Sequence, residues 1–392
     1  MKNIFYKIKV SIIEKRFLKT IIKKIYPYLK GLLFTLLIKE NKFKIISPKK
    51  NIIDKSDIEL AKRIFDSYKA MKSYQKNVHR FYKPSSMWQK HIDSDFAFMK
   101  KSLEENNIDN FLFFLQNFGN WDTCLGIEHQ LLIKNYSKNP LLKKFLSNEL
   151  FQGQREVWSY YNQKKREFSN LNFPRIGNQN GAEVENNFLV YGSFFSSIHA
   201  DIIDKYLKND NHNIIADLGG GYGKLAYYVL KNQNKFTYID FDIPETLVLA
   251  SYFITKSFPN KKPFIFGEEE FKNDFIKNYD LIFLPNWEIE KIKPNSFDIF
   301  MNKNSLGEME PDSAHNYINH IHRTSKYFFS INHEFLRNKF DNGQSSLLNK
   351  EYNINNQFKE LIRYPDLGHL IYENNQTINL DSDIFFYIFE KK

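Results

Sequence analysis

The sequence predicts an α/β protein, with a mainly parallel, doubly wound sheet in its second half and a mostly α-helical region before it. Short β-rich runs alternate with helical stretches from residue 213 onward, which is typical of parallel strands joined by helices. Residues 52–168 show helical periodicity instead, and a segment rich in Gly, Pro and Asn follows them. We therefore expect a basic helical arm at 1–50, a mostly helical domain at 51–190 and a sheet domain at 191–392.

The elements of the second half follow from their apolar patterns. After a boundary loop at 169–192, helices are predicted at 196–207, 222–232, 245–257 and 313–324, and strands at 213–218, 236–241, 279–284, 296–301 and 326–331. Residues 369–373 and 384–390 could pair as a terminal hairpin. Open sheets of this kind bind ligands at the carboxyl ends of their strands, where the strand order reverses.

Composition excludes several classes of protein. Of the 392 residues, 42% are hydrophobic, which is enough for a real core and excludes wholesale disorder. The single cysteine, Cys124, excludes an intrachain disulfide framework and a multi-cysteine zinc site. A reducing, cytoplasmic setting fits this usage.

The net charge of +11 belongs to one end of the chain. Residues 1–50 contain 14 Lys or Arg and 2 acids, whereas the remaining residues contain 42 bases and 43 acids. A protein that grips nucleic acid through its main domain should be basic there. No nucleic-acid partner is therefore predicted.

The basic arm has the pattern of an amphipathic helix. Phe5, Ile8 and Ile12 recur at helical spacing, with lysines between them. Such a helix could pack on its own domain, or residues 1–30 could touch an anionic membrane surface from the cytoplasmic side. The longest apolar stretch, 31–38, is far shorter than the ~20 residues of a membrane span, and no secretory signal is predicted.

A glycine-rich turn follows the first predicted strand of the second half. It reads Asp217-Leu218-Gly219-Gly220-Gly221-Tyr222-Gly223-Lys224 and leads into a helix. Glycines permit a sharp turn and a close approach of a ligand to the backbone, and the helix start offers unpaired N–H groups. A dinucleotide site wants glycines at offsets 0, 2 and 5, but here the offsets are 0, 2 and 4.

The acid before these glycines resembles the pattern of S-adenosylmethionine (SAM)-dependent methyltransferases, which have a Rossmann-like fold. The resemblance implies SAM as cofactor, with Asp217, Gly219, Gly220 and Gly221 around its methionine part. It also implies a second acid, after the next strand, on the ribose hydroxyls. Asp240 and Asp242 both qualify, and Asp242 lies 21 residues after Gly221, close to the ~20 expected of a ribose-binding acid.

A narrower resemblance is to a bacterial family of sugar O-methyltransferases. It rests on Asp242-Ile243-Pro244-Glu245, and on 298–302 leading into Asn304-Ser305-Leu306-Gly307-Glu308-Met309. Leu306 stands where that family often has Phe, and Gln179 where it has Pro. The resemblance covers roughly residues 170–335 and implies a sugar hydroxyl of a bacterial surface glycan or its precursor as acceptor.

Methyl transfer to a hydroxyl needs alignment and a base that takes the hydroxyl proton. Glu308, after the fourth strand, and His333, after the fifth, are the candidates, since both should lie at the carboxyl edge of the sheet. Asn302 is expected at the cofactor, and Ser305 and Tyr191 at the substrate.

Other interpretations stay open at this stage. The acceptor could be something other than a sugar, or the chain could be a membrane-surface accessory protein with a vestigial cofactor pocket. Trp121, Trp158, Tyr160 and Tyr161 could stack on sugar rings or belong to the core. No metal site is predicted, because no ligand spacing is diagnostic, and the sequence does not indicate an oligomeric state.

Overall fold

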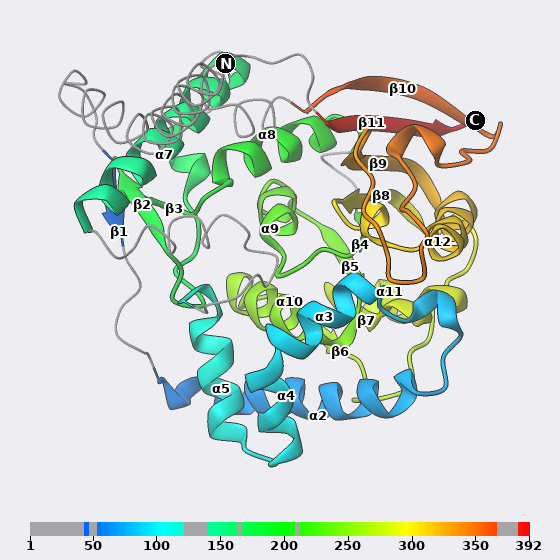
Figure 1. The fold of residues 1–392 in the computed structure, drawn as a ribbon, viewed down its shortest axis with the longest axis horizontal. Coiled ribbons are helices and arrows are strands. Elements are labelled where there is room, and N and C mark those ends of the chain that lie inside the picture. The colour runs from blue at the N-terminus through cyan, green and yellow to red at the C-terminus, as the bar shows by residue number, and fades with distance from the viewer. Residues whose placement is uncertain (1–42, 47–52, 121–139, 163–166, 208–211, 367–382) are drawn as a thin grey trace, which may run out of the picture.

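The computed structural model describes residues 43–46, 53–120, 140–162, 167–207, 212–366 and 383–392 (Figure 1). Most of the predicted basic arm lies outside the described residues, as do Trp121, Cys124 and the predicted strand at 369–373.

The described residues before 163 are mainly helical, as their periodicity predicts. Ser85 and Asn107 begin two of these helices, because their side-chain oxygens accept hydrogen bonds from the backbone N–H groups of Trp88 and Asn110. The dense apolar run that starts at residue 110 forms a largely buried helix. The helices are α2 (Ile58–Gln75), α3 (Ser86–Ser94), α4 (Ala97–Glu104), α5 (Ile108–Asn117) and α7 (Pro140–Asn162).

The predicted boundary loop at 169–192 contains a β-hairpin, so this part of the prediction is wrong. Strands β2 (Gly181–Val184) and β3 (Asn187–Leu189) pair with each other, and β1 (Lys44–Ile46) pairs with β2, all antiparallel. Glu185 and Asn186 join β2 to β3 with φ angles of 49° and 62°, which suits a two-residue hairpin turn. Glutamate seldom adopts positive φ, so the sequence carries no strong hairpin signal here.

An eight-stranded sheet organises the second half of the chain. Its spatial order is β10-β11-β9-β8-β4-β5-β7-β6, in which β11 runs antiparallel to both neighbours and the other pairings are parallel. The strands are β4 (Asn213–Leu218), β5 (Phe236–Asp242), β6 (Pro263–Ile265), β7 (Leu281–Pro285), β8 (Phe297–Lys303), β9 (Ser325–His333), β10 (Phe358–Pro365) and β11 (Ile384–Lys391). The predicted doubly wound α/β fold is confirmed, although the sequence analysis missed β6 and β10.

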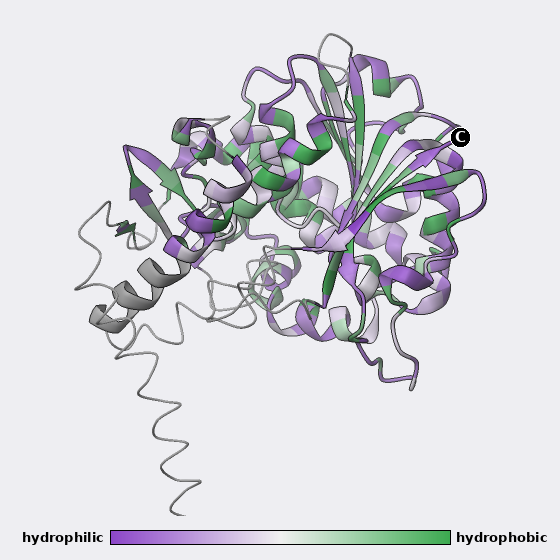
Figure 2. Cartoon of the chain, turned by 90° about the horizontal axis from the view of Figure 1, so that it is seen from above, coloured by the Kyte–Doolittle hydropathy of each residue, from purple (hydrophilic) through white to green (hydrophobic). Residues whose placement is uncertain are grey.

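The strand order reverses at β4, which lies between β5 and β8. The chain moves outward from β4 in one direction through β5 and in the other through β8 and β9. Right-handed crossovers then place α9 (Lys224–Lys231) and α10 (Pro244–Ser257) on one face and α12 (Pro311–Thr324) on the other. Figure 2 shows the fan of strands with helices on both sides. The reversal predicts a binding crevice at the carboxyl ends of β4 and β8.

Two further helices complete the fold. Helix α8 (Ser193–Asp204) precedes the sheet and packs on α9, and the short α11 (Phe275–Asn278) lies between β6 and β7. No helix in the described ranges is long and apolar enough to cross a membrane.

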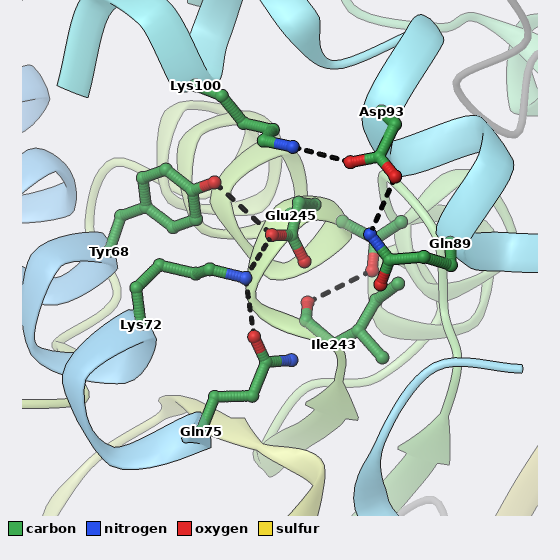
Figure 3. A network of polar contacts seen from close by, with 9 residues as sticks. Tyr68, Lys72, Gln75, Gln89, Asp93, Lys100, Ile243 and Glu245 are labelled. Carbon is green, nitrogen blue, oxygen red and sulfur yellow. Dashed lines mark hydrogen bonds and ion pairs between the residues drawn. The ribbon is translucent and has the colours of Figure 1, made fainter. Parts of the chain in front are cut away.

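Helix α2 packs directly on α10, so the helical region and the sheet share a contact (Figure 3). Glu245, in the first turn of α10, is fully buried. Its Oε1 accepts hydrogen bonds from the Tyr68 hydroxyl at 3.2 Å and from Lys72 Nζ at 2.8 Å. Lys72 also donates to Gln75. This network fixes the start of α10 against α2, and one continuous set of buried apolar side chains runs through both parts.

Candidate active site

A cavity of about 660 Å³ opens at the predicted crevice. Its floor is the glycine turn after β4, together with residues that follow β5, β8 and β9. The opposite wall comes from the N-terminal helical region, and residues around the start of α8 close one side. The lining includes Arg80, Phe81, Lys83, Trp88, His91, Tyr191, Gly192, Asp217, Gly219, Gly220, Gly221, Lys224, Asp242, Lys303, Ser305, Glu308 and His333.

Two glycines of the turn, Gly219 and Gly221, differ in the space around them. Gly219 has a φ of 69°, and a Cβ on it would lie 2.5 Å from the Ser305 Cβ. Gly221 has a φ of 62°, but a Cβ there would meet nothing within 4 Å, because the space in front of it is open. The turn therefore offers backbone to a ligand at Gly221 and is sterically closed at Gly219.

We expect Gly219→Ala to lower the melting temperature of the protein more than Gly221→Ala does. Both substitutions place a side chain at positive φ, which costs about 1–2 kcal/mol. Only Gly219→Ala adds a collision, with Ser305. Differential scanning calorimetry of the two variants measures the difference, and equal losses would contradict the packing described here. The double variant Gly219→Ala, Ser305→Gly should recover part of the loss.

Three carboxyl groups lie beneath and beside this turn. Asp217 and Asp242 line the cavity, whereas Asp240 is fully buried under Gly220. Asp242 accepts hydrogen bonds from the backbone N–H groups of Gly221 at 3.2 Å and Ile243 at 2.7 Å. Neither carboxyl oxygen of Asp240 has a hydrogen-bond partner within the described part of the chain. Of the two acids that the sequence leaves open for the ribose, only Asp242 reaches the cavity.

Burial makes these acids hard to ionise. It raises the pKa of Asp217 from 3.8 to about 8, with the charge of Asp242 adding to the effect. Burial likewise raises the pKa of Asp242 to about 6. The pKa of Asp240 is raised well above its ordinary value, again by burial first and then by its two acidic neighbours. A bound cation would favour the charged forms, so this floor suits a positively charged ligand.

Asn302 does not line the cavity, which differs from its predicted place at the cofactor. Its side chain is fully buried and donates to the Leu218 carbonyl at 2.9 Å and to Ser305 Oγ. Its Oδ1 accepts from the Leu306 N–H and from Asn332. Asn302 therefore holds the ends of β4 and β8 together behind the site. Ser305 shares this task through its bond to the Leu218 carbonyl, at 2.8 Å, but it does reach the cavity.

His333, at the end of β9, forms a hydrogen bond through Nδ1 to the buried carboxylate of Asp383. The same carboxylate accepts the backbone N–H groups of Phe335, at 2.9 Å, and Leu336, at 2.6 Å. Asp383 precedes β11, the antiparallel strand next to β9. The pairing fixes the imidazole ring and directs the Nδ1 proton to Asp383, so Nε2 is the nitrogen that can accept a proton.

Glu308 also lines the cavity, but its carboxylate has a partner from the helical region. The indole N–H of Trp88, in α3, donates to Glu308 Oε2 at 2.7 Å. This bond joins the two walls of the cavity and orients both side chains. Of the two predicted bases, His333 is thus supported by a buried acid, and Glu308 is held by an indole.

Tyr191 lies at the cavity as predicted, and its backbone carbonyl accepts from Lys224 Nζ at 3.1 Å. Of the aromatic residues considered for sugar stacking, the three that the structure describes lie elsewhere. Trp158 is buried in the core against Phe168 and Phe194, and Tyr160 is exposed away from the cavity. Tyr161 lies at a separate, minute hollow.

Two parts of the site were not predicted: the cavity wall formed by residues between 80 and 91, and Asp383, the partner of His333. No sequence pattern indicates that a segment near residue 85 contacts the end of β8, which lies more than 200 residues later in the chain. Asp383 had a weak signal, because it stands directly before a predicted strand. The remaining predicted residues, apart from Asn302, meet at one cavity: Tyr191, Asp217, Gly219, Gly220, Gly221, Asp242, Ser305, Glu308 and His333.

The sequence matches no family model and no curated protein. Solved structures with a similar fold include the mitomycin 7-O-methyltransferase MmcR, at 12% identity and a TM-score of 0.33, over 51% of this chain and 55% of that one. A SAM-dependent methyltransferase from Aquifex aeolicus matches at 13% identity and a TM-score of 0.31, over 48% and 87% of the two chains.

The [4+2]-cyclase SpnF matches about as well, at 13% identity and a TM-score of 0.35, over 51% of this chain and 82% of that one. The match to MmcR spans only about half of the length of that protein. These likenesses extend over about half of this chain, and at such low TM-scores they carry no argument about its activity or its acceptor.

Proposed function

We propose that the protein is a SAM-dependent O-methyltransferase that acts on a sugar hydroxyl. One observation carries the proposal: the glycine turn, its two acids and His333 line the same cavity, and Asp383 accepts a hydrogen bond from His333 Nδ1. The first feature suits a cationic nucleoside, and the second suits the removal of a proton from a hydroxyl.

The residues present fit such a cofactor. The open space before Gly221 allows a ligand to approach the backbone, and Asp242 lies next to it. In this proposal Asp242 receives the ribose hydroxyls, and Asp217 faces the positively charged methionine part. Burial raises the pKa values of both acids, and a cation at this floor would favour their ionised forms.

The chain's own contribution to the reaction is alignment and proton removal. When bound, the cofactor would supply a methyl group that its sulfonium activates for transfer to the acceptor oxygen. His333 Nε2 takes the proton that the hydroxyl loses, and Asp383 stabilises the imidazolium that results. Glu308 and Trp88 form the wall beside the acceptor. Holding two reactants in alignment can account for about 7–11 kcal/mol of the barrier.

Support for a sugar comes from the resemblance around Asp242 and Asn304 and from the character of the wall. Trp88 offers an aromatic surface whose N–H is already satisfied by Glu308, and aromatic rings combine a large apolar contact with defined geometry. Carboxylate and serine oxygens at Glu308 and Ser305 can meet hydroxyl groups. A bacterial surface glycan or its precursor remains part of the proposal.

The proposal predicts that Asp242→Ala weakens SAM binding at least ~10-fold, because a charge-assisted hydrogen bond is lost. Isothermal titration calorimetry of the full chain measures this effect. Asp298→Asn is a matched control, since Asp298 sits at the other end of β8, where it accepts the Ile214 N–H. Unchanged binding in Asp242→Ala would contradict the assignment of the ribose contact.

Activity is tested with methyl-labelled SAM and a panel of free and nucleotide-linked sugars. Label in a sugar supports the proposal. SAM binding without any labelled sugar would favour another acceptor. Failure to bind SAM at all would favour an accessory protein with a vestigial pocket.

A further inference from the structure

Lys224 is a cation in a place where helix electrostatics disfavour one. It is the first residue of α9, directly after the glycine turn. The N-terminal end of a helix carries a partial positive charge, so a lysine there costs some tenths of a kcal/mol. The helix itself therefore does not favour a lysine at this position.

The side chain of Lys224 crosses the cavity wall. Its Nζ donates to the Tyr191 carbonyl at 3.1 Å, and the residue lines the cavity. A Cβ on Gly192 would lie 2.9 Å from this Nζ. Gly192, which has a φ of 82°, thereby leaves room for the ammonium group as well as turning the chain into α8. The positive charge is held at a defined point beside the glycine turn.

Side chains that can carry opposite charges thus flank the same turn. Asp217 stands two residues before its first glycine, and Lys224 follows its last. A ligand that matches both must carry a cation and an anion close together, as the amino-acid end of SAM does. Building on the proposed function, we propose that Lys224 binds the carboxylate of the cofactor, while Asp217 faces its ammonium group. Arginine or lysine with a carboxylate forms the stronger class of hydrogen bond.

The test compares SAM with its decarboxylated analogue by calorimetry, using the full chain. The wild-type protein should bind SAM at least ~10-fold more tightly than the analogue. Lys224→Met should abolish this preference by weakening SAM binding alone, and Lys224→Arg should restore part of it. Normal binding of the analogue by Lys224→Met shows that the variant is folded.

Lys303→Met is the matched control, because Lys303 lines the same cavity at the end of β8. We expect this variant to keep the preference for SAM. A preference that survives in Lys224→Met, or that disappears in Lys303→Met instead, would overturn the assignment and leave the proposed function standing. A wild-type protein that binds neither compound would overturn the proposed function itself, and the assignment with it.

Discussion

Replacing His333 by alanine should lower kcat by ~10²–10⁴-fold, the usual contribution of a general base. In the proposed function the imidazole takes the hydroxyl proton; in the structure it lines the cavity, and Asp383 holds it in place. SAM affinity should stay within a few-fold of wild type, because the cofactor floor is formed by β4 and β5. Steady-state kinetics and calorimetry on the same preparation separate the two effects.

Asp383→Asn tests whether the pair acts together. The amide can still accept backbone hydrogen bonds, but it cannot stabilise an imidazolium as a carboxylate does. We expect a loss of kcat of about 10-fold or more, and a change in the acidic limb of the pH–rate profile. Glu308→Gln keeps an oxygen that can accept the Trp88 indole N–H, so its loss should be smaller. A larger loss in Glu308→Gln than in His333→Ala would identify Glu308 as the base.

The affinity for SAM should rise steeply with pH between about 6 and 7.5. Without ligand, burial keeps Asp217 largely protonated in this range, because its pKa is about 8, and Asp242 titrates at its lower edge, near 6. A cationic ligand favours the ionised forms, so binding releases protons. Each proton released contributes up to ~10-fold in affinity per pH unit. The measurements should be made below pH ~7.7, because the α-amino group of SAM itself begins to lose its proton at about pH 7.7–8.0.

Calorimetry in buffers of different ionisation enthalpy counts the protons released. Asp217→Asn should flatten the pH dependence, because the group that loses the proton is absent. The unliganded protein should show the opposite trend in stability. Its folded state binds more protons than its unfolded state, so the free energy of unfolding falls as pH rises from about 4 to about 8. Proton uptake on binding, or an affinity that does not change with pH, would contradict the description of this floor.

Most of the sheet could be predicted because the sequence patterns of its strands and turns are local. Asp217 to Lys224 shows a strand end, a turn that only glycines fit, and a helix start within eight residues. Strands β5, β7, β8, β9 and β11 were predicted to within two residues of their bounds. The hairpin at 181–189 was missed because its turn uses Glu185 at positive φ, and β10 was missed because its outer residues are polar and exposed.

Only part of the site could be predicted, because the sequence indicates which strand ends meet but not which distant segments pack against them. Residues at the ends of neighbouring parallel strands must meet, so Asp217, Asp242 and His333 could be placed at one edge. Trp88 and Asp383 reach that edge through packing and through an antiparallel strand, and no spacing in the sequence encodes such contacts. Asn302 was placed at the edge correctly, but its side chain turns inward to bind the Leu218 carbonyl.

Four consecutive residues, 242–245, connect the cavity to α2. Asp242 faces the cavity, and Glu245 receives Tyr68 and Lys72 from α2 (Figure 3). Cutting the chain at residue 190 to isolate the sheet would expose the apolar side of α10 and leave the Glu245 carboxylate without its ammonium partner. Residues 53–120 therefore belong in any shortened form of the protein that is meant to retain ligand binding.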